Sequence, residues 1–73
     1  MSDKSTATIQ VNGENETLAA ATLAALLDEK EIGADARGVA VALNGSVVPR
    51  AAWRETQLRP GDAVEIVHAR QGG

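Results

Sequence analysis

Two Asn-Gly dipeptides, at residues 12–13 and 44–45, set the strongest limits on how this chain can fold. Both residues of such a dipeptide tolerate positive φ, so Asn-Gly between two strand-like runs predicts a tight β-hairpin. The first dipeptide lies between residues 6–11, which alternate polar and apolar, and residues 14–19. The second follows the apolar run 39–43, which is short for a helix and fits a buried strand. One hairpin is therefore expected at each place.

Between the two hairpins the hydrophobic period changes to that of a helix. Leu23, Leu26 and Leu27 occupy positions i, i+3 and i+4, which lie on one stripe of a helix. Four neighbouring alanines also favour helix. A helix is therefore expected from about Thr22, and Gly33 is its predicted stop.

The last third of the chain adds a return strand, a crossover and one more strand. Residues 46–48 complete the second hairpin, and Pro49 ends its ladder because proline has no N–H. Residues 50–59 show no clear period and predict a turn-rich crossover. The tight turn 60–62 then leads into an alternating strand at 63–67.

The predicted order is hairpin, helix, hairpin, crossover and strand. One helix can cover one face of a mixed four- or five-stranded sheet, which gives a two-layer α+β domain. The β-grasp (ubiquitin-like) arrangement uses this order. We therefore expect a disordered start over 1–5, a β-grasp domain over 6–67 and a flexible tail over 68–73.

Composition excludes several classes of function. The chain has 73 residues, no cysteine and a single histidine, so disulfides, thiolate metal sites and multi-histidine metal sites are not expected. The net charge of −3 and the single aromatic residue argue against a nucleic-acid binder. No run approaches membrane-spanning length and no secretory signal is recognisable, which favours a cytoplasmic protein. With no glycine-rich phosphate loop and no paired nucleophile, an autonomous enzyme is not expected.

The sequence ends in Gly72-Gly73, and two interpretations of this end are open. It is either a flexible end or a terminus that partners use chemically. Glycine lacks Cβ, so its backbone can enter a narrow cleft. A terminal carboxylate has a pKa of about 3.5 and resists nucleophilic attack as an anion, so it needs activation. Transfer of AMP from ATP supplies a leaving group, and a sulfur nucleophile displacing AMP leaves a thiocarboxylate.

An ordered set of motifs over roughly residues 6–73 resembles the ThiS family of thiamin-pathway sulfur carriers. In order, the motifs are Val41-Ala42-Leu43-Asn44-Gly45, Val47-Val48-Pro49-Arg50, Trp53, Leu58 with Gly61-Asp62, Val64-Glu65-Ile66-Val67 and Gln71-Gly72-Gly73. The resemblance implies a β-grasp carrier that binds no cofactor or metal itself.

The resemblance also implies a set of partners. A ThiF-like enzyme adenylates the terminal glycine with ATP and magnesium, a cysteine desulfurase route supplies sulfur, and thiazole synthase receives it. By this resemblance Gly73 is the sulfur acceptor and Gly72 threads into the partner's cleft. Arg70 and Gln71 flank the reactive end, where they either dock on the partner as the tail threads into it or keep the tail soluble. A carrier needs a free tail, which favours a monomer.

Two other functions are compatible with the same pattern. The molybdopterin-synthase small subunit shares the fold and the terminal diglycine, but that family tends to approach the diglycine with Phe and Pro. It also lacks a segment like Arg50-Ala51-Ala52-Trp53. A ubiquitin-like modifier or interaction module is the third possibility, with its tail either joined to lysines or inert.

Three further side chains have both a functional and a structural interpretation. Trp53 is either a partner contact or a cap on the small core. Arg50 either steers an acidic partner or is simply solvated. His68 is expected at the exposed end of the last strand, because nothing near it in sequence requires a base.

Overall fold

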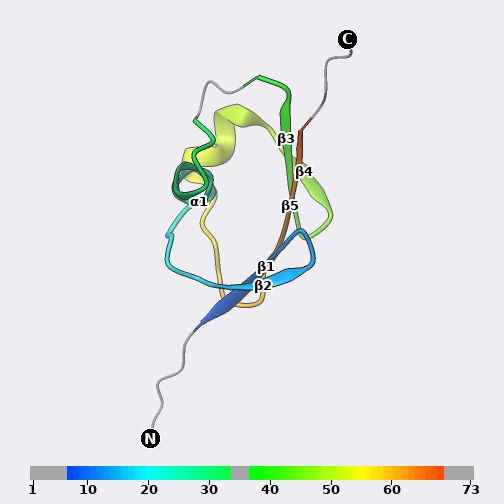
Figure 1. Ribbon diagram of the computed structural model, residues 1–73. Helices are drawn as coiled ribbons and strands as arrows, with labels where there is room; N and C mark the ends of the chain where they lie inside the picture. The colour runs from blue at the N-terminus through cyan, green and yellow to red at the C-terminus, as the bar shows by residue number, and fades with distance from the viewer. Residues whose placement is uncertain (1–6, 34–36, 69–73) are drawn as a thin grey trace, which may run out of the picture.

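The fold is a five-stranded mixed sheet, seen in a computed structural model that describes residues 7–33 and 37–68 (Figure 1). Its strands are β1 (Thr8–Val11), β2 (Glu14–Thr17), β3 (Val39–Leu43), β4 (Ser46–Val48) and β5 (Ala63–His68). The spatial order is β2-β1-β5-β3-β4, in which β1 and β5 are parallel and the other neighbours antiparallel. The last strand along the chain is therefore the central strand of the sheet.

One face of the sheet is covered by α1 (Leu23–Glu29) and the 3₁₀ helix η1 (Arg50–Glu55), which lie on the same side in Figure 1. The core between these layers consists of Ile9, Val11, Ala20, Leu23, Leu26, Leu27, Val41, Trp53, Leu58, Val64 and Ile66. None of the helices in the described ranges is long and apolar enough to cross a membrane. The predicted α+β fold, a β-grasp sheet with one main helix on one face, is confirmed.

The leucine stripe is confirmed, but the helix ends earlier than the sequence predicts. Thr22 is the N-cap, and its Oγ1 accepts a hydrogen bond from the backbone N–H of Ala25 at 3.2 Å. At the other end, Ile32 N–H donates to the Leu27 carbonyl at 2.8 Å, and Glu31 has φ of 64°. This is a Schellman motif with Glu31 in the left-handed position, so the stop predicted at Gly33 is wrong.

The predicted turn-rich crossover over 50–59 contains regular structure. Residues Arg50–Glu55 form η1, with Pro49 as its N-cap. Trp53 is the only buried residue of this element, so no hydrophobic period marks it in the sequence. The indole Nε1 donates to the Val48 carbonyl at 2.9 Å, which ties the crossover to the edge strand β4.

The strand boundaries differ from the prediction by one or two residues. β1 begins at Thr8 and β2 ends at Thr17, whereas the sequence predicts 6–11 and 14–19. β5 extends to His68, one residue into the predicted tail. Residues 1–6 and 69–73, which include the predicted disordered start and most of the predicted tail, lie outside the described residues.

Candidate functional site

The candidate site begins where β5 carries the chain toward the terminal diglycine. The predicted acceptor Gly73 and its neighbours Gly72, Gln71 and Arg70 lie outside the described residues, so their assigned roles stay predictions. What the structure describes is the strand that leads to them. β5 pairs with β3 from Val64 to His68 and with β1 only at Ala63 and Val64.

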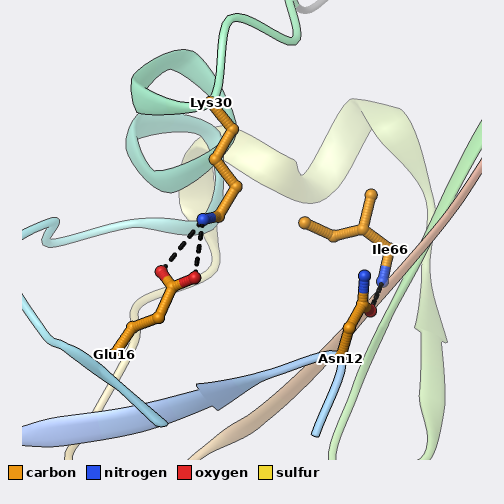
Figure 2. A network of polar contacts seen from close by, with 4 residues as sticks. All are labelled: Asn12, Glu16, Lys30 and Ile66. Carbon is orange, nitrogen blue, oxygen red and sulfur yellow. Dashed lines mark hydrogen bonds and ion pairs between the residues drawn. The ribbon is translucent and has the colours of Figure 1, made fainter. Parts of the chain in front are cut away.

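The side chain of Asn12 extends the β1 side of this ladder. Asn12 lies in the first hairpin turn with φ of 52°, and its backbone N–H donates to the Val64 carbonyl at 2.8 Å. Its Oδ1 accepts a hydrogen bond from the Ile66 N–H at 2.8 Å (Figure 2). The amide oxygen therefore replaces the backbone acceptor that β1 no longer supplies after its turn.

The side chain of Asn44 does the same on the β3 side. Asn44 also has φ of 52°, and its Oδ1 accepts from the Ala63 N–H at 2.9 Å while its own N–H donates to the Ala63 carbonyl at 2.7 Å. Its Nδ2 donates to Asp62 Oδ1 at 3.0 Å. The start of β5 is thus bonded to the second hairpin turn, just as its middle is bonded to the first.

The face of the sheet that points away from α1 carries a small apolar surface. Val47 is 75% exposed and Val67 58% exposed, and the register places Ala42 between Val47 and the exposed Glu65, and Ala40 beside Val67. These four residues form what we call the open face. Neither described helix covers it, and its small side chains allow another protein to approach the backbone closely.

A groove of about 430 Å³ lies on the helix side of the sheet, next to Asn12. Its lining residues are Val11, Asn12, Glu14, Glu16, Lys30, Ile32, Ile66 and His68. Across it, Lys30 Nζ lies 2.9 Å from both carboxylate oxygens of Glu16, which ties α1 to β2 (Figure 2). In the part of the chain that the structure describes, no group of three or more acidic or histidine side chains is placed to hold a metal ion.

The structure separates the two interpretations of Trp53. Its side chain is 2% exposed and lies in the core, so the core-cap interpretation is confirmed and almost no ring surface is left for a partner. Arg50 is exposed, with Cζ 5.4 Å from the centroid of the Trp53 ring, a cation–π geometry. Its role toward a partner stays a prediction. His68 is exposed at the end of β5, as predicted.

The sequence interpretation missed the side-chain roles of Asn12 and Asn44. Asn-Gly predicts a turn through its backbone alone, since Gly-Gly or Asp-Gly predicts the same turn. The available signal was the amide at both turns, since an asparagine side chain can stand in for a backbone group.

Comparisons with a family model and with curated proteins both match ThiS proteins. The model of the ThiS family matches residues 9–73. The sulfur carrier protein ThiS of Thermus thermophilus is 38% identical over 65 residues, which is 89% of this chain and 98% of that protein. A thiazole synthase of Paramagnetospirillum magneticum is 39% identical over 64 residues, or 86% of this chain. The chain spans only 19% of that synthase.

Solved structures agree with the sequence comparison. The crystal structure of the thiamine biosynthesis protein ThiS from Geobacter metallireducens superimposes with a TM-score of 0.73 at 36% identity, covering 90% of this chain and 99% of that one. A solution structure of a thiamine biosynthesis protein from the same organism gives 0.71 at 35% identity, covering 90% and 87%. The chain therefore belongs to the ThiS family.

Proposed function

We propose that this chain is a sulfur carrier of thiamine biosynthesis whose Gly73 carboxylate is adenylated and then converted to a thiocarboxylate. The observation that carries the proposal is the family match, which runs from residue 9 through Gly73. It is supported by the similarity to a curated sulfur carrier over nearly that protein's whole length.

The chemistry begins at the terminal carboxylate. One carboxylate oxygen attacks the α-phosphorus of ATP, pyrophosphate leaves, and a mixed anhydride with AMP results. A sulfur nucleophile then attacks the carbonyl carbon, and AMP leaves with the electron pair of the C–O bond. Where the donor is a persulfide, a thiol must next cleave the S–S bond to release the thiocarboxylate.

The reagents for these steps come from partners. The chain has no cysteine, so it has neither a nucleophilic thiol nor a side chain that could carry a persulfide. We assign the ATP and magnesium site to a ThiF-like adenylating enzyme and the sulfur supply to a cysteine desulfurase. The carrier contributes the acceptor carboxylate and a surface that docks, in the cytoplasm where ATP is available.

The open face is our candidate docking surface for the adenylating enzyme. It combines the exposed Val47 and Val67 with the small Ala40 and Ala42, on β3, β4 and β5, and β5 is the last strand before the tail in the sequence. Docking there holds the carrier while Arg70 to Gly73 enter the enzyme. Gly72 and Gly73 suit a narrow cleft because they lack Cβ.

We assign thiazole synthase as the sulfur acceptor. The support is the relative from Paramagnetospirillum magneticum, a thiazole synthase that contains a region 39% identical to this chain. Placing two proteins on one chain raises their effective concentration toward each other, which is useful where one delivers a group to the other. No specific feature of the described residues favours a molybdopterin-synthase role or protein modification.

The test is a reconstitution with mass measurement. The chain is incubated with ATP, magnesium, a ThiF-type enzyme, a cysteine desulfurase and cysteine, and its intact mass is recorded. Exchange of oxygen for sulfur adds about 16 Da, the same nominal mass as oxidation of Met1, so the C-terminal fragment is weighed separately. A gain on the Gly73 fragment that requires ATP supports the proposal.

The matched control is the chain without Gly73, which keeps the whole folded domain. It is expected to bind the adenylating enzyme but to gain no sulfur. If the unaltered chain also keeps an ordinary carboxylate with enzymes that are active on another ThiS protein, sulfur carriage is the wrong function.

A further inference from the structure

We propose that the edge of β5 beyond β1 is a pairing site for an extended segment of the adenylating enzyme. The site consists of the Ile66 carbonyl, the His68 N–H and the groove beside them. This inference rests on the function proposed above and goes beyond it, because it assigns a second contact separate from the open face.

The edge is open because β1 turns away too early. β1 ends at Val11, and its last partner on β5 is Val64, whereas β5 continues to His68. Among the described residues no strand pairs with β5 beyond Val64 on this side. An unpaired strand edge offers a row of donors and acceptors to another chain.

The register shows which backbone groups face this edge. On the β3 side, Asn44 N–H donates to the Ala63 carbonyl, so bonded positions on β5 alternate from Ala63 and reach Val67. On the β1 side, the Val64 carbonyl accepts from the Asn12 backbone N–H, and the Ile66 N–H donates to Asn12 Oδ1. By the same alternation the Ile66 carbonyl and the His68 N–H point toward the missing continuation of β1.

These two groups form the next position of a ladder. Asn12 supplies only an acceptor for the Ile66 N–H, and the hairpin leaves from there. One residue of a parallel neighbouring strand would donate to the Ile66 carbonyl and accept from the His68 N–H. A peptide that adds to a sheet edge in this way gains affinity from main-chain bonds and specificity from alternate side chains.

The residues that line the groove indicate which side chains the added strand should carry. It lies beside Ile66 and His68, and its rim carries Glu14, Glu16 and Lys30. Lys30 already pairs with Glu16, whereas Glu14 is exposed and makes no ion pair with any described residue. An added strand therefore fits best when it places a lysine or arginine beside Glu14.

The position along the chain favours the adenylating enzyme as the occupant. Gly73 follows His68 by five residues (73 − 68), at most about 18 Å of extended chain, so an enzyme that holds the terminal carboxylate lies within reach of this edge. A strand pairing here would fix the direction in which the tail leaves the sheet. That is the geometric requirement for placing a carboxylate against the α-phosphate of ATP.

The test compares His68→Pro with His68→Ala. Proline removes the one N–H in question and is tolerated at strand edges, while the β3 ladder, which uses Val67, is kept. Alanine removes the same side chain but keeps the N–H. With a ThiF-type enzyme and ATP–pyrophosphate exchange as the readout, we expect the KM for the proline variant to exceed that for the alanine variant about 3- to 10-fold.

A second measurement uses the unaltered chain, so its result does not depend on whether His68→Pro folds. Hydrogen exchange of the His68 amide is followed in the unaltered chain with and without the enzyme, and we expect slower exchange in the complex. Equal KM values for the two variants together with unchanged exchange overturn the strand-pairing proposal. A dimer of the unaltered chain that dissociates in His68→Pro overturns it too, because the occupant is then a second copy. If neither the unaltered chain nor His68→Ala is adenylated, the proposed function itself fails.

Discussion

Asn12 and Asn44 bind the central strand β5 from opposite sides, each through its side-chain Oδ1. Each lies at φ of 52° in an Asn-Gly hairpin turn, and each accepts a β5 backbone N–H on its Oδ1. Asn12 binds Ile66 at 2.8 Å and Asn44 binds Ala63 at 2.9 Å. The two turns that shape the hairpins therefore also hold the strand that leads to the proposed sulfur acceptor.

Asn12→Gly tests the first of these contacts. Glycine keeps the positive φ of the turn but removes the acceptor of the Ile66 N–H. We expect faster hydrogen exchange at Ile66 and a loss of about 1 kcal/mol in the free energy of unfolding. NMR-detected exchange and urea unfolding measure the two effects.

Asn12→Asp is the matched control, because it keeps an oxygen in the same place and tolerates the left-handed conformation. Its Ile66 amide should stay protected. Equal exchange at Ile66 in the glycine and aspartate variants would show that the side-chain oxygen does not hold β5.

Acidic substitutions on the open face test its role in docking. Val47 and Val67 are largely exposed, so Val47→Asp and Val67→Asp should change the free energy of unfolding by less than about 1 kcal/mol. A buried charge at an interface weakens binding strongly, and we expect the KM in the adenylation assay to rise about tenfold or more.

Thr17→Asp is the comparison for these variants, because Thr17 is an exposed residue of β2 at the far edge of the sheet. Its KM should match that of the unaltered chain. If all three aspartate variants behave alike, the effect is one of net charge and the open face is not the docking surface.

What the sequence could predict was local, and what it missed depends on contacts distant in sequence. The hairpins follow from Asn-Gly and α1 from a leucine period, each within a few residues. η1 contains one buried residue, so only its packing against the core reveals it. Asn12 and Ile66 are 54 residues apart, and no local sequence pattern predicts a contact over that separation. The terminal diglycine is visible in the sequence, but the hydrogen bonds that hold β5, the strand before it, are not.

Trp53→Phe tests the bond between the crossover and β4. Phenylalanine keeps most of the buried ring but removes the donor that lies 2.9 Å from the Val48 carbonyl. We expect a loss of about 1–3 kcal/mol in the free energy of unfolding, from the unmade hydrogen bond and the smaller ring. Circular dichroism during urea unfolding is the measurement, because the chain has no other aromatic residue for fluorescence. An unchanged unfolding midpoint would mean that the indole N–H contributes nothing.

Glu31→Gly should stabilise the protein, which few glycine substitutions do. Glu31 has φ of 64° at the end of α1, where a side chain costs about 1–2 kcal/mol and glycine costs almost none. Glycine also makes the unfolded chain more flexible, which cancels about 0.4–1 kcal/mol of the strain that the substitution relieves. We expect a net gain of about 0.5–1 kcal/mol.

The matched control is Glu29→Gly, two residues earlier at the last residue of α1, where the backbone is still helical and the same substitution should cost about 0.5–1 kcal/mol. Both residues are exposed and acidic, so the change in net charge is identical and only the backbone conformation differs. Opposite signs in urea unfolding support the Schellman ending of α1. A loss of stability in both variants means that Glu31 does not occupy the left-handed position in solution.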